Sequence, residues 1–244
     1  MGSGIAQVSA AAGFQVWLYD ISKEQLQKVK LSPNIKTTTN LNDFKNCDFC
    51  IEAAVEKPEI KYKIFKELDA LVRPDVILAS NTSSIPIAQL AKQTRRPDKV
   101  IGMHFMNPVP KMQCVEVIRA ERTSRETLES TLSFAKKLGK TPVTVKDAPG
   151  FVVNRILIPM LNEAVHVLEE GLASKEDIDL AMKLSCNHPM GPLTLADFVG
   201  LDTCLYIMEV MGREPAPLLK KMVAQGKLGR KSGEGFYQWG QVSS

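Results

Sequence analysis

Residues 100–116 have the sequence VIGMHFMNPVPKMQCVE, which predicts a strand, a turn and a returning strand. The apolar run Val100–Met103 ends in His104, and an Asn-Pro step with a second proline then predicts the turn. A second β-like run, Cys114–Ile118, carries Glu116 in its middle. Open α/β sheets hold their ligands at the carboxyl ends of strands, where this pattern places the imidazole. The carboxylate would fix the tautomer of that imidazole. The alternative is a structural histidine at a sheet edge and a glutamate on a solvated face.

The composition is that of an ordinary globular protein, with 244 residues that are 44% hydrophobic and 24% charged. This length predicts one or two domains. The formal net charge is +4, but the lysines and arginines are scattered, so nucleic acid is not an expected partner. The sequence contains no apolar run long enough for a transmembrane helix, so we expect no membrane association.

The five cysteines do not form the pattern of a disulfide framework, because their number is odd. This usage favours a reducing compartment, and we expect a cytoplasmic protein, with a mitochondrial matrix location left open. Cys47 and Cys50 form a C-x-x-C pair without two further ligands nearby, so we expect no metal site. Cys50 lies in an apolar run and is expected to be a buried thiol.

The N-terminal stretch has the order expected of a dinucleotide-binding unit. Small residues over Gly2–Ala12 predict a helix that ends at Gly13, and Gln15–Asp20 predicts a strand that ends in a carboxylate. In such units an acidic residue at this place bonds the adenosine ribose and selects NAD over NADP. Asp20 stands eighteen residues after Gly2, close to the usual spacing. The strand and the two earlier glycines of the fingerprint are not in the given sequence.

Helix and strand patterns alternate over residues 1–147, which predicts a Rossmann-type, doubly wound and mostly parallel sheet. After Asp147 the pattern becomes helical, so we expect an all-helical second domain over 148–244. The expected elements of the first domain include helices at Ile21–Lys30, Lys57–Val72, Pro86–Gln93 and Ser124–Leu138, and strands at Asp48–Ala54, Val76–Ser80 and Thr141–Lys146. The helices expected in the second are Phe151–Glu170, Lys175–Lys183, Pro192–Met211 and Pro217–Gly226.

Seven motifs in this order resemble the 3-hydroxyacyl-CoA dehydrogenase family, of the 3-hydroxybutyryl-CoA dehydrogenase type. They are MGSGIAQ at 1–7, SNTSS at 80–84, GMHFMNPVP at 102–110, VEVI at 115–118, KDAPGFVVNR at 146–155, HPMGPLTLADFVGLDT at 188–203 and GRKSGEGFY at 229–237. The resemblance implies NAD-dependent oxidation of a 3-hydroxyacyl-CoA in fatty acid or butanoate metabolism, and the reverse reaction. It also implies a homodimer formed through the helical domain.

The resemblance assigns roles to individual residues. His104 matches the catalytic base and Glu116 its carboxylate partner, while Ser83 and Asn154 match residues that contact the reacting oxygen of the substrate. Alternatively, Ser83 caps the helix near Pro86 and Asn154 is a helix-surface amide. The positions that match cofactor-binding residues are Gly2, Asp20, Glu56, Lys61, Asn81, Ser83, Asn107 and Lys231.

Two departures from the family leave other hypotheses open. The missing first strand would expose two sheet edges, and the stretch between Asp20 and Asp48 lacks the long helical hairpin that covers the acyl-CoA in the family. One alternative is a catalytically silent, truncated or crystallin-like member of the fold. The other is a related dehydrogenase that acts on a free hydroxy acid or sugar acid.

Overall fold

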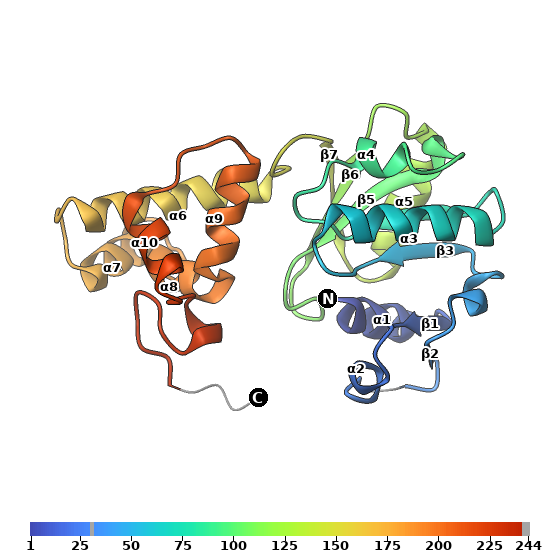
Figure 1. Ribbon diagram of the computed structural model, residues 1–244, viewed down its shortest axis with the longest axis horizontal. Coiled ribbons are helices and arrows are strands. Elements are labelled where there is room, and N and C mark those ends of the chain that lie inside the picture. The colour runs from blue at the N-terminus through green and yellow to red at the C-terminus, as the bar shows by residue number, and fades with distance from the viewer. Residues whose placement is uncertain (30–31, 241–244) are drawn as a thin grey trace. The chain divides into compact units, whose positions relative to one another are not determined.

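The computed structural model describes residues 1–29 and 32–240, and it divides the chain into two compact units, Met1–Phe151 and Val152–Ser244 (Figure 1). The first unit is an α/β domain and the second is helical. This agrees with the predicted fold class. The division falls a few residues after the composition change at Asp147, beyond the turn that contains Pro149 and Gly150.

The strands of the first unit form two sheets in the described part of the chain. One sheet has the order β1-β2, the other β3-β4-β5-β6-β7, and all neighbouring strands are parallel except β5 and β6. Strands β1 and β3 are therefore not hydrogen-bonded neighbours within one sheet. The strands are β1 Val16–Tyr19, β2 Ile35–Thr38, β3 Phe49–Glu52, β4 Ile77–Ser80, β5 Val100–Phe105, β6 Cys114–Arg119 and β7 Thr141–Lys146.

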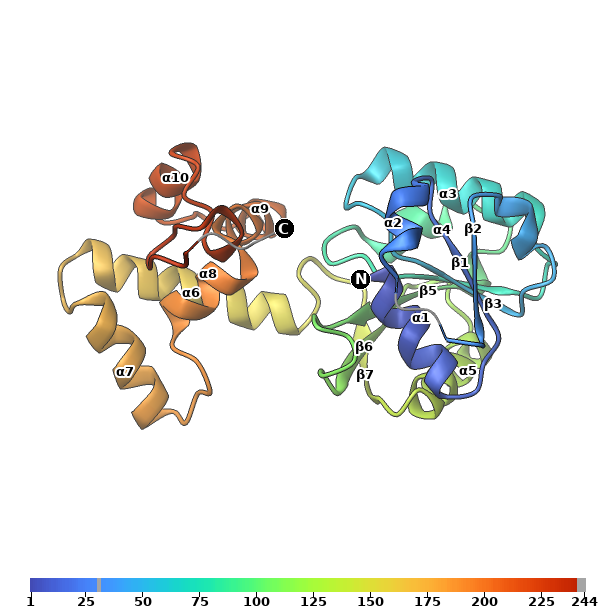
Figure 2. The same ribbon diagram turned by 90° about the horizontal axis from the view of Figure 1, so that it is seen from below.

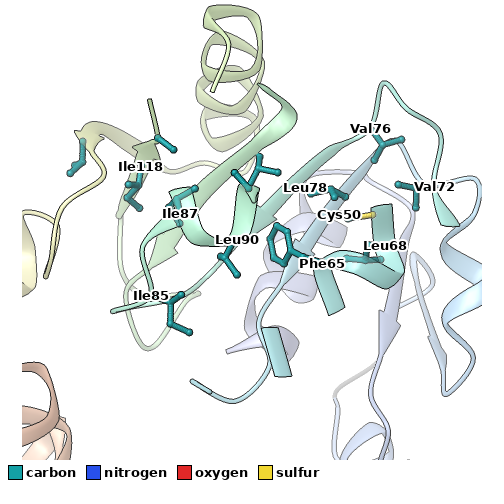
Figure 3. Packing of buried hydrophobic residues seen from close by; sticks show 14 of the residues in the cluster. Cys50, Phe65, Leu68, Val72, Val76, Leu78, Ile85, Ile87, Leu90 and Ile118 are labelled. Atoms are coloured by element: carbon teal, nitrogen blue, oxygen red, sulfur yellow. The ribbon is translucent and has the colours of Figure 1, made fainter. Parts of the chain in front are cut away.

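Helices cover both faces of the five-stranded sheet. Helices α3 (Pro58–Leu71) and α4 (Ile87–Ala91) lie on one face, and α1 (Gly2–Ala11) and α5 (Arg125–Lys137) on the other (Figure 2). Successive side chains of a strand alternate between the faces. Leu78 accordingly packs with Phe65 of α3 and Leu90 of α4 (Figure 3), whereas its neighbour Ala79 packs in the opposite cluster.

Helix α1 packs against both sheets. Its Ile5 belongs to the cluster formed with β4, β5 and β6, whereas Ala6 and Ala10 pack on Ile35 of β2 and the partly buried Leu18 of β1. A single helix thus joins the β1-β2 ribbon to the five-stranded sheet through apolar contacts.

Capping residues define several helix ends. The Ser22 hydroxyl accepts from the amide of Gln25 at the start of α2 (Lys23–Gln27), and Ser124 does the same for Thr127 at the start of α5. The helix expected over Ile21–Lys30 is shorter in the structure, where α2 ends at Gln27. Its last expected residue, Lys30, lies outside the described residues. Beyond α1 and α5 the chain turns at Gly13 and Gly139, which have φ of +88° and +71°. These left-handed values favour glycine, as the pattern predicted.

The second unit consists of α6 Val153–Glu169, α7 Lys175–Ser185, α8 Pro192–Val199, α9 Leu201–Val210 and α10 Pro217–Ala224. The prediction of one helix over Pro192–Met211 was wrong. Gly200 has φ of +99°, and this left-handed residue ends α8 and starts α9 in a new direction. Asp197, buried in α8, accepts from the amides of Phe236 and Tyr237 and so ties the C-terminal segment to the bundle.

Helix α3 has a buried face that differs from the apolar stripe expected from its sequence. Ile60 is 39% exposed, whereas Lys61 and Asp69 are buried beside Phe65 and Leu68. The buried charges are paired with side chains from outside the helix, which a hydrophobic pattern does not reveal. Among the described residues, no helix is long and apolar enough to cross a membrane.

Candidate active site

The antiparallel pairing of β5 with β6 brings a histidine and a glutamate together. In the register His104 lies directly opposite Glu116, and opposite residues of an antiparallel pair project to the same face. His104 Nδ1 lies 2.8 Å from Glu116 Oε2. The carboxylate can only accept a hydrogen bond when ionised, so it selects the tautomer in which Nδ1 carries the proton. Nε2 is then the atom that can take up or release a proton.

The pair lies at the buried face of the sheet that α3 and α4 cover. Met103 and Phe105 point into the opposite cluster, so alternation directs the His104 ring to this face. The side chains of His104 and Glu116 are 7% and 1% exposed. The ring centroid of Phe151 lies 5.7 Å from that of the imidazole. A His–Glu pair held in an apolar surrounding, with little contact with water, suits proton transfer to and from a bound substrate.

Gly102 explains why α4 can approach the strand that carries His104. A Cβ atom at Gly102 would lie 2.8 Å from the Cβ of Ile118 and 2.9 Å from Cδ1 of Ile87 in α4. Distances this short do not occur between real side-chain carbons, so any larger residue would displace the helix or the strand. The glycine two residues before His104 therefore lets helix and sheet pack closely next to the candidate site.

The stretch after β4 carries the next two candidate residues. Asn81 is buried, and its Oδ1 accepts from the amide of Phe105, which fixes the end of β5 beside His104. Ser83 is partly buried, and its amide donates to Glu56 Oε1 over 2.8 Å. The N-cap residue of α4 is Pro86 and no side chain caps this helix there, so Ser83 is not its cap.

Glu56 bonds the stretch after β4 and forms an ion pair with Lys61. Glu56 Oε1 accepts from the hydroxyls of Thr82 and Ser84 and from the amides of Ser83 and Ser84. Burial alone would raise the pKa of Glu56, but the Lys61 ammonium and these hydrogen bonds outweigh it and hold the pKa below its usual value. The Lys61 side chain is 0% exposed and bonds Glu52 Oε1 at 2.7 Å. Its ammonium therefore faces protein atoms.

The N-terminus of α1 fits the pyrophosphate of a dinucleotide. Its first turn contains Gly2 and Gly4 and no acidic side chain, so its amides present partial positive charge without a competing carboxylate. A Cβ atom at Gly4 would lie 3.0 Å from the Cβ of Val109, so glycine lets α1 pack closely against the loop after β5. Asp20 follows β1 directly, and its Oδ1 accepts from the amide of Ser22. These residues fit NAD in the first unit.

The remaining candidates belong to other segments of the chain. Asn107 is exposed in the loop after β5. Asn154 lies in the first turn of α6 and Lys231 lies in the second unit, where its Nζ bonds Asp202. Within residues 1–29 and 32–240 no group of three or more histidines, cysteines or acids could hold a metal ion. Burial raises the pKa of Cys50 to about 12 and also raises that of Cys47, which makes both poor thiolate donors.

Sequence reasoning missed two buried polar residues near the site. Glu52 ends β3 and binds Lys61, and its only signal was a carboxylate at the end of an apolar run. Lys140, which follows α5, donates to the carbonyls of Val109 and Met112 over 2.6 and 2.9 Å and holds the loop that carries Asn107. A lysine just before a strand gives no sequence signal for this role.

Comparison with known proteins covers nearly the whole chain. The family model "3-hydroxyacyl-CoA dehydrogenase, NAD binding domain" matches residues 1–33 and 29–148, and the model of the C-terminal domain of the same family matches 150–239. A probable 3-hydroxybutyryl-CoA dehydrogenase of Deinococcus radiodurans is 53% identical, with 98% of this chain and 96% of the relative aligned. The human mitochondrial hydroxyacyl-coenzyme A dehydrogenase is 43% identical over 98% of this chain and 88% of its own. The crystal structure of (S)-3-hydroxybutyryl-CoA dehydrogenase from Ralstonia eutropha matches with a TM-score of 0.94 and 49% identity, over 99% of this chain and 96% of that one.

Proposed function

This chain belongs to the 3-hydroxyacyl-CoA dehydrogenase family and is an NAD-dependent oxidoreductase of 3-hydroxyacyl-CoA, and we propose that His104 is its acid/base and Glu116 the partner of His104. The observation that carries the proposal is the buried contact of 2.8 Å between Nδ1 and Oε2 across the β5–β6 pair. It leaves Nε2 as the proton-transferring atom and puts a negative charge beside the ring.

The proposed proton transfer uses the histidine in both directions. During oxidation His104 Nε2 takes the proton of the C3 hydroxyl, while the imidazolium that forms is stabilised by the adjacent Glu116 carboxylate. NAD, when bound, accepts the hydride from C3. During reduction of a 3-oxoacyl-CoA, the imidazolium returns the proton to the oxygen. Positioned acid/base groups of this kind contribute typically about 10²–10⁴-fold to the rate.

Polar residues near the pair are proposed to hold the substrate and the cofactor. Ser83 would donate to the reacting oxygen. It follows β4 two residues after Asn81, and Asn81 fixes the end of β5 beside His104. Asn154 keeps the same proposed role on the strength of its KDAPGFVVNR motif. Asp20 and the first turn of α1 would hold the adenosine ribose and the pyrophosphate.

Replacement of His104 by alanine tests the central assignment. We expect turnover of acetoacetyl-CoA, followed by the absorbance of NADH, to fall by about 10²–10⁴-fold. NADH binding, followed by fluorescence, should be unchanged. His166→Ala is the matched control, because His166 lies on α6 in the second unit and pairs with Glu169. Equal turnover in wild type and His104→Ala would refute the assignment.

Self-association through the second unit is a further part of the proposal. Large apolar side chains are exposed there, including Ile156 on α6, Leu172 after it, and Leu180 and Leu184 on α7; Leu184 is 75% exposed. Burial of such side chains against a second copy would stabilise a homodimer. Leu184→Asp should then shift the mass measured by light scattering from dimer to monomer, whereas an unchanged mass would remove Leu184 from the interface.

The five cysteines, which are all thiols, support a reducing compartment such as the cytoplasm.

A further inference from the structure

Lys61 has an unusual environment for a lysine. It lies in the second turn of α3, its side chain is fully buried, and its ammonium contacts three oxygen atoms. These are Glu52 Oε1 at 2.7 Å, the carbonyl of Ala54 at 3.2 Å and Glu56 Oε2 at 3.4 Å. An ammonium has three protons to donate, so this arrangement satisfies it within the protein.

The two glutamates connect this ammonium to the carboxyl ends of two strands. Glu52, the last residue of β3, also accepts from the Ser80 hydroxyl at 2.6 Å, and Ser80 is the last residue of β4. Glu56 accepts all its further hydrogen bonds from the turn at residues 82–84. The cluster of Glu52, Glu56 and Lys61 therefore has a formal charge of −1 and a direct connection to Ser83.

Glu56 bonds the turn that carries Ser83 through a single oxygen. One oxygen of Glu56 accepts from four donors of the 82–84 turn, and only the ionised carboxylate is an acceptor at both oxygens. Among the described residues that contact Glu56, Lys61 from α3 is the charged group, with Glu52 of β3 on the other side of its ammonium. The turn contributes hydroxyls and amides. The positive charge of Lys61 offsets the burial that disfavours an ionised Glu56.

We propose that Lys61 is a positioning residue: its buried ammonium keeps Glu56 ionised, and Glu56 in turn holds the 82–84 turn, which carries Ser83 and directly follows Asn81, in place for cofactor and substrate. This rests on the proposed roles of Asn81 and Ser83. Loss of Lys61 should act through Glu56 and should therefore depend on pH.

The test compares Lys61→Met, Glu56→Gln and the double variant Lys61→Met/Glu56→Gln with wild type. Both kcat/KM and the Kd of NADH are measured from about pH 5 to about pH 9. Without the ammonium, the pKa of Glu56 rises, so we expect the acid limb of both profiles to move to higher pH by about one unit or more. At a fixed pH below the limb, this shift corresponds to about a tenfold loss of activity. The double variant should lose this shift, because glutamine does not titrate. Lys63→Met is the matched control, since Lys63 lies on the same helix with its side chain 77% exposed.

The outcomes separate positioning from a purely structural role. Equal losses at every pH, or a shift that persists in the double variant, would overturn the proposal. If Lys61→Met does not fold because it leaves Glu52 unpaired, Glu52→Gln/Lys61→Met removes both charges. Its shift should have the same direction but be smaller, because loss of the Glu52 carboxylate favours an ionised Glu56. The NADH profile needs no turnover, so it reports on Lys61 even if His104→Ala retains activity and the proposed acid/base role fails.

Discussion

The Glu116 carboxylate should affect the rate chiefly through its charge, and Glu116→Gln isolates this effect. Glutamine keeps the size of the side chain and an oxygen that can accept from His104 Nδ1, but removes the negative charge. The atoms in contact are 2.8 Å apart, which puts the charge centres of imidazolium and carboxylate roughly 4 Å apart. At an effective dielectric constant of about 20, such a pair is worth about 4 kcal/mol. That energy corresponds to a factor of about 10³ in rate.

We expect a smaller loss than this limit, because only part of the positive charge has formed on the ring in the transition state. The expected fall in kcat is about 10²–10³-fold for oxidation of 3-hydroxybutyryl-CoA, measured as NADH formation, with the KM for NAD unchanged. Glu121→Gln makes the same chemical change at an exposed position and should keep wild-type kcat. Urea unfolding of both variants controls for stability. A kcat of Glu116→Gln within about threefold of wild type would refute the electrostatic reasoning.

Two further predictions concern buried charges outside the pair. Lys140→Met leaves the two loop carbonyls that Lys140 bonds without their donor, so urea unfolding should show a loss of about 2–4 kcal/mol, against little change for the exposed Lys137→Met. Asp69→Asn should cost about 3 kcal/mol at neutral pH, because it breaks the buried pair with Arg96. Burial opposes ionisation of Asp69, but hydrogen bonds from Arg95 and Arg96 lower its pKa, so its contribution is complete above the ordinary aspartate pKa of about 3.9 and is lost as pH falls through the lowered value. A difference between wild type and Asp69→Asn that persists unchanged at pH 2 would contradict this account.

The sequence predicts most helices and strands of the first unit because their ends carry local signals. Ser22 and Ser124 cap helices as their residue type suggests, and Gly139 turns the chain after α5. The same local rules fail over Pro192–Met211, where a long apolar pattern continues through Gly200. A glycine inside such a pattern can be part of a helix or end it. In the second unit Gly200 ends α8, which the local pattern alone does not reveal.

The candidate site was predictable where strand register alone determines it. Two β-like runs joined by a turn put His104 and Glu116 on neighbouring strands, and alternation along each strand puts them on one face. Lys61 shows the opposite case. Its burial depends on Glu52, nine residues before it on another element, and no period of apolar residues along α3 encodes such a partner. The roles of Ser83 and Asn154 came from the family resemblance alone.

The division of the strands into two sheets has a consequence for how the first unit opens. Among the described residues, the cluster that joins α1 to the β1-β2 ribbon contains three buried side chains, Ala6, Ala10 and Ile35, far fewer than either cluster of the five-stranded sheet. The ribbon should therefore be the least protected cooperative unit in amide hydrogen exchange, opening without global unfolding. Asp20 directly follows β1 of this ribbon, so the binding free energy of a dinucleotide held by Asp20 would stabilise the ribbon. The part of the fold that is easiest to open would then gain most from the bound cofactor.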